Sequence, residues 1–154
     1  MTGPEETHHT KLTRNLSELL QELRVAQAGV QILFAFLLTV AFTDRFARAG
    51  TFVHTLHIVT VLLTCTSATL LIAPAAWHRM LFRKRRRAEI IRAANSCALG
   101  GLALLAAAMT STVLLVTVVV IGFGWLAPII ATCIGLSFLS LWFLLPWRIG
   151  SRRS

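Results

Sequence analysis

Charge is scarce in this chain, and that scarcity argues against an ordinary soluble domain. Only 14% of the 154 residues are charged, whereas 56% are hydrophobic and the mean hydropathy is +0.73. A soluble domain typically has about a quarter of its residues charged. The few charges lie in short blocks between long apolar runs, which is typical of a protein that crosses a membrane several times. The length predicts a single helical bundle without a separate soluble module.

Acidic residues are the rarest charged group, and their positions restrict the possible chemistry. The chain has six Asp and Glu residues. None lies within a predicted span, because Asp44 falls in a short loop and Glu89 in a basic one. Transporters coupled to protons or sodium commonly use a carboxylate inside the membrane. The HExxH, GxSxG and Walker-type motifs are also missing. We therefore expect a non-enzymatic protein with no catalytic residues and no cofactor.

The small number of cysteines disfavours both a disulfide framework and a metal site. Their number is odd, all lie in apolar runs, and neither a CxxC motif nor paired histidine spacing accompanies them. We interpret them as small, buried packing residues. They are Cys65, Cys97 and Cys133.

Four apolar runs predict an all-α membrane protein, a bundle of four transmembrane helices in a domain of residues 13–148. At a rise of 1.5 Å per residue each run is long enough to cross the hydrocarbon core. The predicted spans are about residues 25–42, 52–77, 96–121 and 125–146. An amphipathic lead-in is expected to begin near Asn15, which can cap a helix that carries leucines on one face. The polar residues 1–12 predict a disordered tail, and residues 149–154 form a basic tail.

Small residues at every fourth position of the last two predicted spans predict close packing between these two helices. They are Ala103, Ala107 and Ser111 on the third span, and Ala127, Ala131 and Gly135 on the fourth.

The distribution of basic residues predicts that both termini are cytoplasmic. Of the 15 Lys and Arg residues, three lie in the first 24 residues, seven in residues 78–95 and three after residue 147. Only Arg45 and Arg48 lie in the loop between the first two spans. Basic residues stay on the cytoplasmic side of a membrane, so we expect a plasma-membrane protein with its N- and C-termini inside. Since the basic residues sit at membrane boundaries, we expect no nucleic-acid partner.

Polar side chains gather at the cytoplasmic end of the first span, with two glutamines in its cytoplasmic third and an arginine just before its start. Gln27 and Gln31 are one turn apart on one helix face, and Arg24 lies roughly on the same side. An amide in hydrocarbon needs a hydrogen-bond partner, so these residues are expected to face other helices. They fix the bundle or a homo-oligomer in one interpretation, and they line a polar vestibule in the other.

Two histidines lie at the outer end of the second span. His54 and His57 are three residues apart and point to similar sides of the helix. Histidines can relay protons or bind a metal. The alternative is that water or lipid headgroups solvate both rings at the membrane boundary.

An unbroken basic run lies in the loop between the second and third spans. It predicts contact with anionic lipid headgroups, while its other interpretation is a topology signal alone. The run consists of Arg83, Lys84, Arg85, Arg86 and Arg87.

Two segments, ELLQELRVAQAGVQILFAFLLTVAF (residues 18–42) and LLIAPAAWHRMLFRKR (residues 70–85), resemble a family of small four-span proteins of high-GC Gram-positive bacteria, a domain of unknown function. The resemblance covers about residues 12–148, and some members of that family carry an automatic sodium:proton antiporter label. It implies family-typical positions at Arg24, Gln27, Gln31, Pro74, His78 and Arg79. We expect His78 and Arg79 to lie near Arg24 and Glu22, where they would tie the first two helices together.

Two functional hypotheses follow. The first is a non-enzymatic multi-pass membrane protein of structural or interaction type, whose basic cytoplasmic face contacts anionic lipid or a partner. The alternative is a small oligomeric transporter or channel for protons or ions, assembled around the face of Gln27 and Gln31.

Overall fold

The chain is helical over nearly all the residues that its computed structural model describes, which are 4–81 and 87–151. Side chains are described for residues 21–77 and 93–148. These ranges contain no strand, so the all-α prediction is confirmed. The elements are α1 (Pro4–Ala41), α2 (Asp44–Ala47), α3 (Thr51–Leu81), α4 (Arg87–Ile121), α5 (Leu126–Leu139), the π-helical turn η1 (Ser140–Leu144) and α6 (Leu145–Ser151).

Four helical stretches are long and apolar enough to cross a membrane. They are Gln21–Ala41, Thr51–Trp77, Ala93–Ile121 and Leu126–Arg148. The predicted boundaries agree with these to within four residues at every end. The prediction of a multi-pass membrane protein with four candidate spans is confirmed, since each of these helices is long and apolar enough to cross the hydrocarbon core.

The N-terminal segment differs from the prediction. Helix α1 begins at Pro4 and not near Asn15, so most of the segment predicted as a disordered tail is helical. Proline is favoured at the first helical position, because its missing N–H would have no partner there and its φ angle already suits a helix. The lead-in and the first span are therefore one continuous helix of 38 residues.

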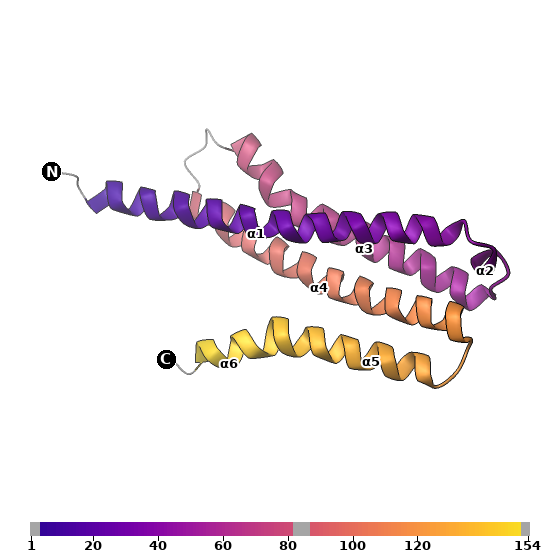
Figure 1. Ribbon diagram of the computed structural model, residues 1–154. Coiled ribbons are helices and arrows are strands. Elements are labelled where there is room, and N and C mark those ends of the chain that lie inside the picture. Colours follow the sequence, from indigo (N-terminus) through magenta and orange to yellow (C-terminus); the bar gives the residue numbers. More distant parts are fainter. Residues whose placement is uncertain (1–3, 82–86, 152–154) are drawn as a thin grey trace.

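Helices α1, α3 and α4 form the packed part of the bundle, and the fourth span lies to one side of it (Figure 1). The interface of α3 with α4 is the most extensive, α1 packs mainly on α3, and α5 packs on α4. The start of α1 and the end of α6 lie at one end of the bundle, while α2 and the α4–α5 turn lie at the other (Figure 1). We refer to these as the terminal end and the α2 end.

Close contact between α3 and α4 depends on the absence of a side chain at Gly101. A Cβ atom at that position would lie 2.8 Å from Cγ and Cδ2 of Leu71. Leu71 is fully buried on α3, and the neighbouring Ser67 hydroxyl donates a 2.7 Å hydrogen bond to the Gly101 carbonyl. The backbone of α4 at Gly101 therefore packs directly on the Leu71 side chain of α3. Small residues permit this close approach of helices in membrane proteins.

The fourth span is held by small residues on one of its faces only. Ala127 and Ala131 are buried, and a Cβ atom at Gly135 would contact α4 at 3.3 Å. The predicted stripe on the fourth span is thus confirmed. The stripe on the third span is wrong, because Ala103 and Ala107 are exposed and α4 directs another face into the bundle. Within an 18-residue apolar window of each span, the share of buried residues falls from 39% in the third span to 6% in the fourth.

Candidate functional site

Gln27 joins α1 to α3 through a hydrogen bond inside the bundle. Its Nε2 atom donates to the carbonyl oxygen of Leu71 at 2.9 Å. That carbonyl lies three residues before Pro74, which is buried within α3, and the helix continues past the proline to Leu81. A proline inside a membrane helix is tolerated where neighbouring groups satisfy the backbone around it. The interhelical interpretation of Gln27 is therefore the one that the structure supports.

Gln31 lies one turn further along α1 but in a different environment. Its side chain is exposed on the outer face of the bundle, and within the described part of the chain no hydrogen bond reaches its amide. It is also the central residue of the candidate span Gln21–Ala41, ten residues from either end, whereas the predicted span of residues 25–42 placed it in the cytoplasmic third. Gln31 is therefore about 15 Å along the helix from each end of the candidate span, at 1.5 Å per residue. A glutamine side chain is too short to reach a headgroup from that depth.

Arg24 is exposed at the terminal end of the same span. It lies about two turns from Gln31, close enough to the boundary for its long side chain to extend toward water. The three polar residues of the first span thus have different environments. Gln27 bonds to α3 inside the bundle, Gln31 is exposed at mid-span, and Arg24 is exposed near the end of the span. They do not form one shared vestibule within a single chain.

A buried phenylalanine organises the two histidines at the α2 end. Thr43 caps α2 by accepting a hydrogen bond from the Phe46 backbone N–H, and this short helix turns the Phe46 ring inward. His54 Nε2 lies 3.1 Å from the Phe46 carbonyl oxygen. Since a carbonyl only accepts, Nε2 carries the proton. The Phe46 ring packs against both imidazoles, with centroid distances of 4.7 Å to His54 and 4.8 Å to His57.

Of the two histidines whose side chains the structure describes, the bundle buries His57. Only 8% of it is exposed, and its Nδ1 atom is buried without a hydrogen-bond partner. The prediction that water or headgroups solvate both rings is therefore wrong for His57, because α2 folds over the end of α3 and covers it. Among the described residues no group of three or more His, Cys, Asp or Glu side chains is arranged to hold a metal ion.

A stripe of buried polar residues continues from His57 along α3. Thr60, Thr64 and Ser67 follow at helical spacing and are fully buried. The Thr60 and Thr64 hydroxyls donate to carbonyls four residues earlier, at 2.7 and 2.8 Å. Thr112 on α4 does the same from a buried position. Sequence reasoning missed this stripe, although polar residues at intervals of three and four in an apolar run were the available signal.

The cysteines differ in part from their interpretation as buried packing residues. Cys65 and Cys133 are exposed on the apolar surface, while Cys97 is half-buried. A weakly polar thiol faces lipid at little cost, so its presence in an apolar run does not predict which face it occupies. All three are free thiols.

Several predicted site residues lie outside the part of the chain whose side chains are described. The expected contacts of His78 and Arg79 with Arg24 and Glu22, and the headgroup contacts of the basic run, therefore stay predictions. The side chains concerned are His78, Arg79, Arg83, Lys84, Arg85, Arg86 and Arg87.

A comparison with known families places nearly the whole chain in a single family. The model of a family of unknown function, DUF6328, matches residues 5–146. The chain belongs to this family. No curated protein and no solved structure matches it. The expected family of unknown function covering nearly the whole chain is confirmed, whereas the bacterial group and the antiporter label stay predictions for this DUF6328 protein.

Proposed function

We propose that this DUF6328 protein is a non-enzymatic membrane protein of interaction type that assembles with a second copy of itself through α1. The observation that carries the proposal is the exposed amide of Gln31 at the centre of a span. An amide left without partners in hydrocarbon costs several kcal/mol. Lipid tails offer no hydrogen bond, so a protein group at the same depth is the available partner.

A second copy supplies such a group by symmetry. Two copies inserted with the same topology place their Gln31 side chains at the same depth, and a two-fold axis along the membrane normal brings the same face of both helices together. Each amide offers two donors and an acceptor, so the pair can satisfy one another. The exposed residues one turn to either side are Ala28 and Ala35, which allow close approach of two helices.

Assembly would also concentrate the basic residues. In the proposed topology, the terminal end lies on the cytoplasmic side of the plasma membrane. The loop between the second and third spans of each copy would then face the same leaflet. Each basic residue near an anionic surface contributes about 1 kcal/mol to binding. The basic run of two copies would then form one cytoplasmic face for anionic lipid or an acidic partner.

Cysteine cross-linking tests the geometry of the proposed interface. In a background where the three native cysteines are replaced by alanine, Ala35→Cys should form a disulfide-linked dimer in liposomes under mild oxidation. Phe36→Cys is the matched control, because it is also exposed but lies about 100° further around the helix. Equal cross-linking at both positions, or none at Ala35→Cys, would contradict an interface centred on Gln31.

A second candidate function is transport of protons or cations, and the buried polar stripe on α3 supports it. The stripe includes an imidazole nitrogen without a partner at His57, and imidazoles can carry protons along such a path. Liposomes containing the protein and a pH-sensitive dye test this under imposed proton, sodium and potassium gradients. Flux above that of empty liposomes, lost in His57→Phe and in Gln31→Leu, would favour transport. Absence of flux under all three gradients would exclude it.

A further inference from the structure

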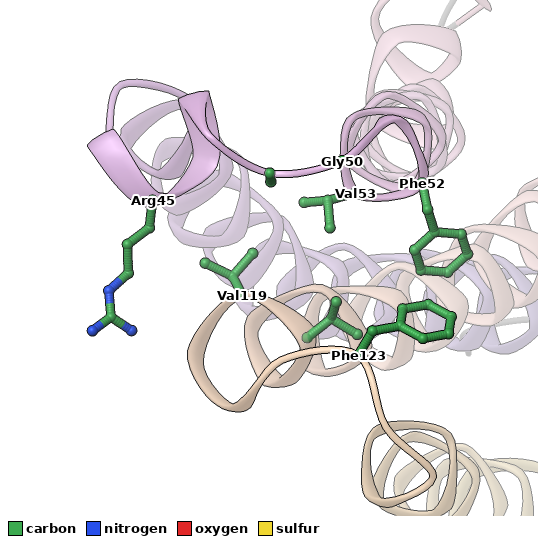
Figure 2. A pocket seen from close by; sticks show the side chains of 8 residues that line it. Arg45, Gly50, Phe52, Val53, Val119 and Phe123 are labelled. Atoms are coloured by element: carbon green, nitrogen blue, oxygen red, sulfur yellow. The ribbon is translucent and has the colours of Figure 1, made fainter.

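The α2 end of the bundle contains an open cavity of about 290 Å³. It lies between α2, the first turn of α3 and the last turn of α4 (Figure 2). Val53 and Val119 line its middle part, the rings of Phe52 and Phe123 bound one side, and Arg45 extends from α2 on the other (Figure 2). The two rings meet edge to face with centroids 5.3 Å apart.

The cavity coincides with the boundary of the predicted spans. Val53 lies in the first turn of the Thr51–Trp77 span and Val119 in the last turn of the Ala93–Ile121 span. Arg45 follows the end of the first span by four residues. The apolar walls thus lie at the depth of acyl chains near the surface, while the guanidinium lies at the depth of headgroups. Exposed aromatic rings at this level are typical of a membrane boundary.

The charge at the mouth of the cavity is available for a ligand. Among the described residues no hydrogen bond or ion pair engages the Arg45 side chain. Arg48, three residues away in the same loop, instead donates from Nε to the Asp44 carbonyl oxygen at 3.2 Å and does not line the cavity. A guanidinium binds phosphate through two parallel hydrogen bonds, which suits Arg45 to a phosphate group.

We propose that this cavity is a binding site for one anionic phospholipid of the leaflet that α2 faces. The Arg45 guanidinium binds the lipid phosphate, and the first part of an acyl chain packs on Val53, Val119 and the two phenylalanine rings. The volume is close to the lower limit of about 300 Å³ for small-molecule sites, so it holds a segment of the chain, while the remainder lies along the apolar surface of α4. This site lies at the other end of α3 from Trp77, after which the basic run follows in the sequence.

Native mass spectrometry of the full chain in detergent micelles tests the proposal. The micelles are supplied with phosphatidylglycerol, and the measured quantity is the affinity for the most tightly retained lipid. Arg45→Gln should lower that affinity about tenfold or more, because a charge-assisted contact is lost. Arg48→Gln removes the same charge from the same loop and should leave it unchanged. The basic run is identical in all variants, so its contribution cancels.

Three further conditions distinguish lipid bound in this cavity from lipid or phosphate bound elsewhere on the chain. Ala49→Phe, which fills the cavity and retains Arg45, should also lose the lipid, while unchanged circular dichroism shows that the bundle is intact. Phosphatidylcholine should be retained less tightly, since its headgroup carries no net charge. Inorganic phosphate should not displace the lipid. Equal losses in Arg45→Gln and Arg48→Gln, full retention in Ala49→Phe, or displacement by inorganic phosphate would each overturn the proposal.

Discussion

The two adjacent glycines of α4 allow the contact between α3 and α4 to be tested one methyl group at a time. A Cβ atom at Gly101 would lie 2.8 Å from two carbons of Leu71 and 3.3 Å from its backbone nitrogen. Optimal carbon–carbon contact is about 3.5–4.0 Å, so the overlap is roughly 0.7 Å. A Cβ atom at Gly100 would meet only Leu70 Cδ1, at 3.4 Å, which is ordinary contact.

Gly101→Ala should therefore destabilise the protein relative to Gly100→Ala. Overpacking a filled interior costs about 1–3 kcal/mol. Both changes also gain up to about 1 kcal/mol from the higher helix propensity of alanine. This gain is common to the two variants, so the free energies of unfolding should differ by about 1–3 kcal/mol. Leu71 is fully buried, so its side chain can rotate away only against closely packed neighbours, which places the value toward the upper part of that range.

The assay is unfolding in mixed micelles with increasing sodium dodecyl sulfate, followed by far-ultraviolet circular dichroism. Equal stability of Gly101→Ala and Gly100→Ala would show that α3 and α4 do not approach as closely as the contact between Gly101 and Leu71 requires. The double variant Gly101→Ala with Leu71→Ala adds a second check. Its loss should be smaller than the sum of the two single losses by about 0.5–3 kcal/mol, as expected for residues in contact.

Three further predictions concern the polar ties, the α2 end and the basic loop. Gln27→Leu and Ser67→Ala each remove one interhelical hydrogen bond. Each should lower the free energy of unfolding in the same assay by about 0.6 kcal/mol, at most about 1.7. A larger loss would show that more than one hydrogen bond is lost with each side chain. Phe46→Ala should cost about 3 kcal/mol and release α2, which hydrogen exchange would show as faster exchange confined to residues 43–50. Neutralising residues 83–87 should weaken binding to anionic vesicles by about 1 kcal/mol per charge, measured by co-sedimentation, and unchanged binding would reduce the run to a topology signal.

The spans could be predicted from the sequence because hydropathy and length are local properties. The helical segment from Pro4 to Asn15 could not, since polar residues without an apolar run do not distinguish a helix from a disordered tail. The buried stripe of Thr60, Thr64 and Ser67 was missed for a related reason. Threonine and serine satisfy their own hydroxyls within a helix, so they occur on lipid-facing and interior faces alike.

The spacing of Gln27 and Gln31 illustrates what a pattern cannot resolve. Residues four apart share a helix face, and the sequence therefore predicts one common environment. The two side chains nevertheless differ by about 40° around the helix, and the edge of α3 falls between them. Gln27 reaches the Leu71 carbonyl, whereas Gln31 remains outside. Only the position of the neighbouring helix decides which amide bonds inside the bundle and which one stays exposed.

Self-association in a bilayer is the most direct test of the claim that Gln31 is an assembly contact. Donor- and acceptor-labelled copies of the full chain are mixed in liposomes, and energy transfer is measured as lipid is added to dilute the protein. Concentration-dependent transfer is expected for the wild type and for Gln31→Asn, and its loss is expected in Gln31→Leu. The matched control is Thr39→Val, which is also exposed on α1 and whose hydroxyl bonds within its own helix, so its transfer should equal that of the wild type. Undiminished transfer in Gln31→Leu would contradict the account.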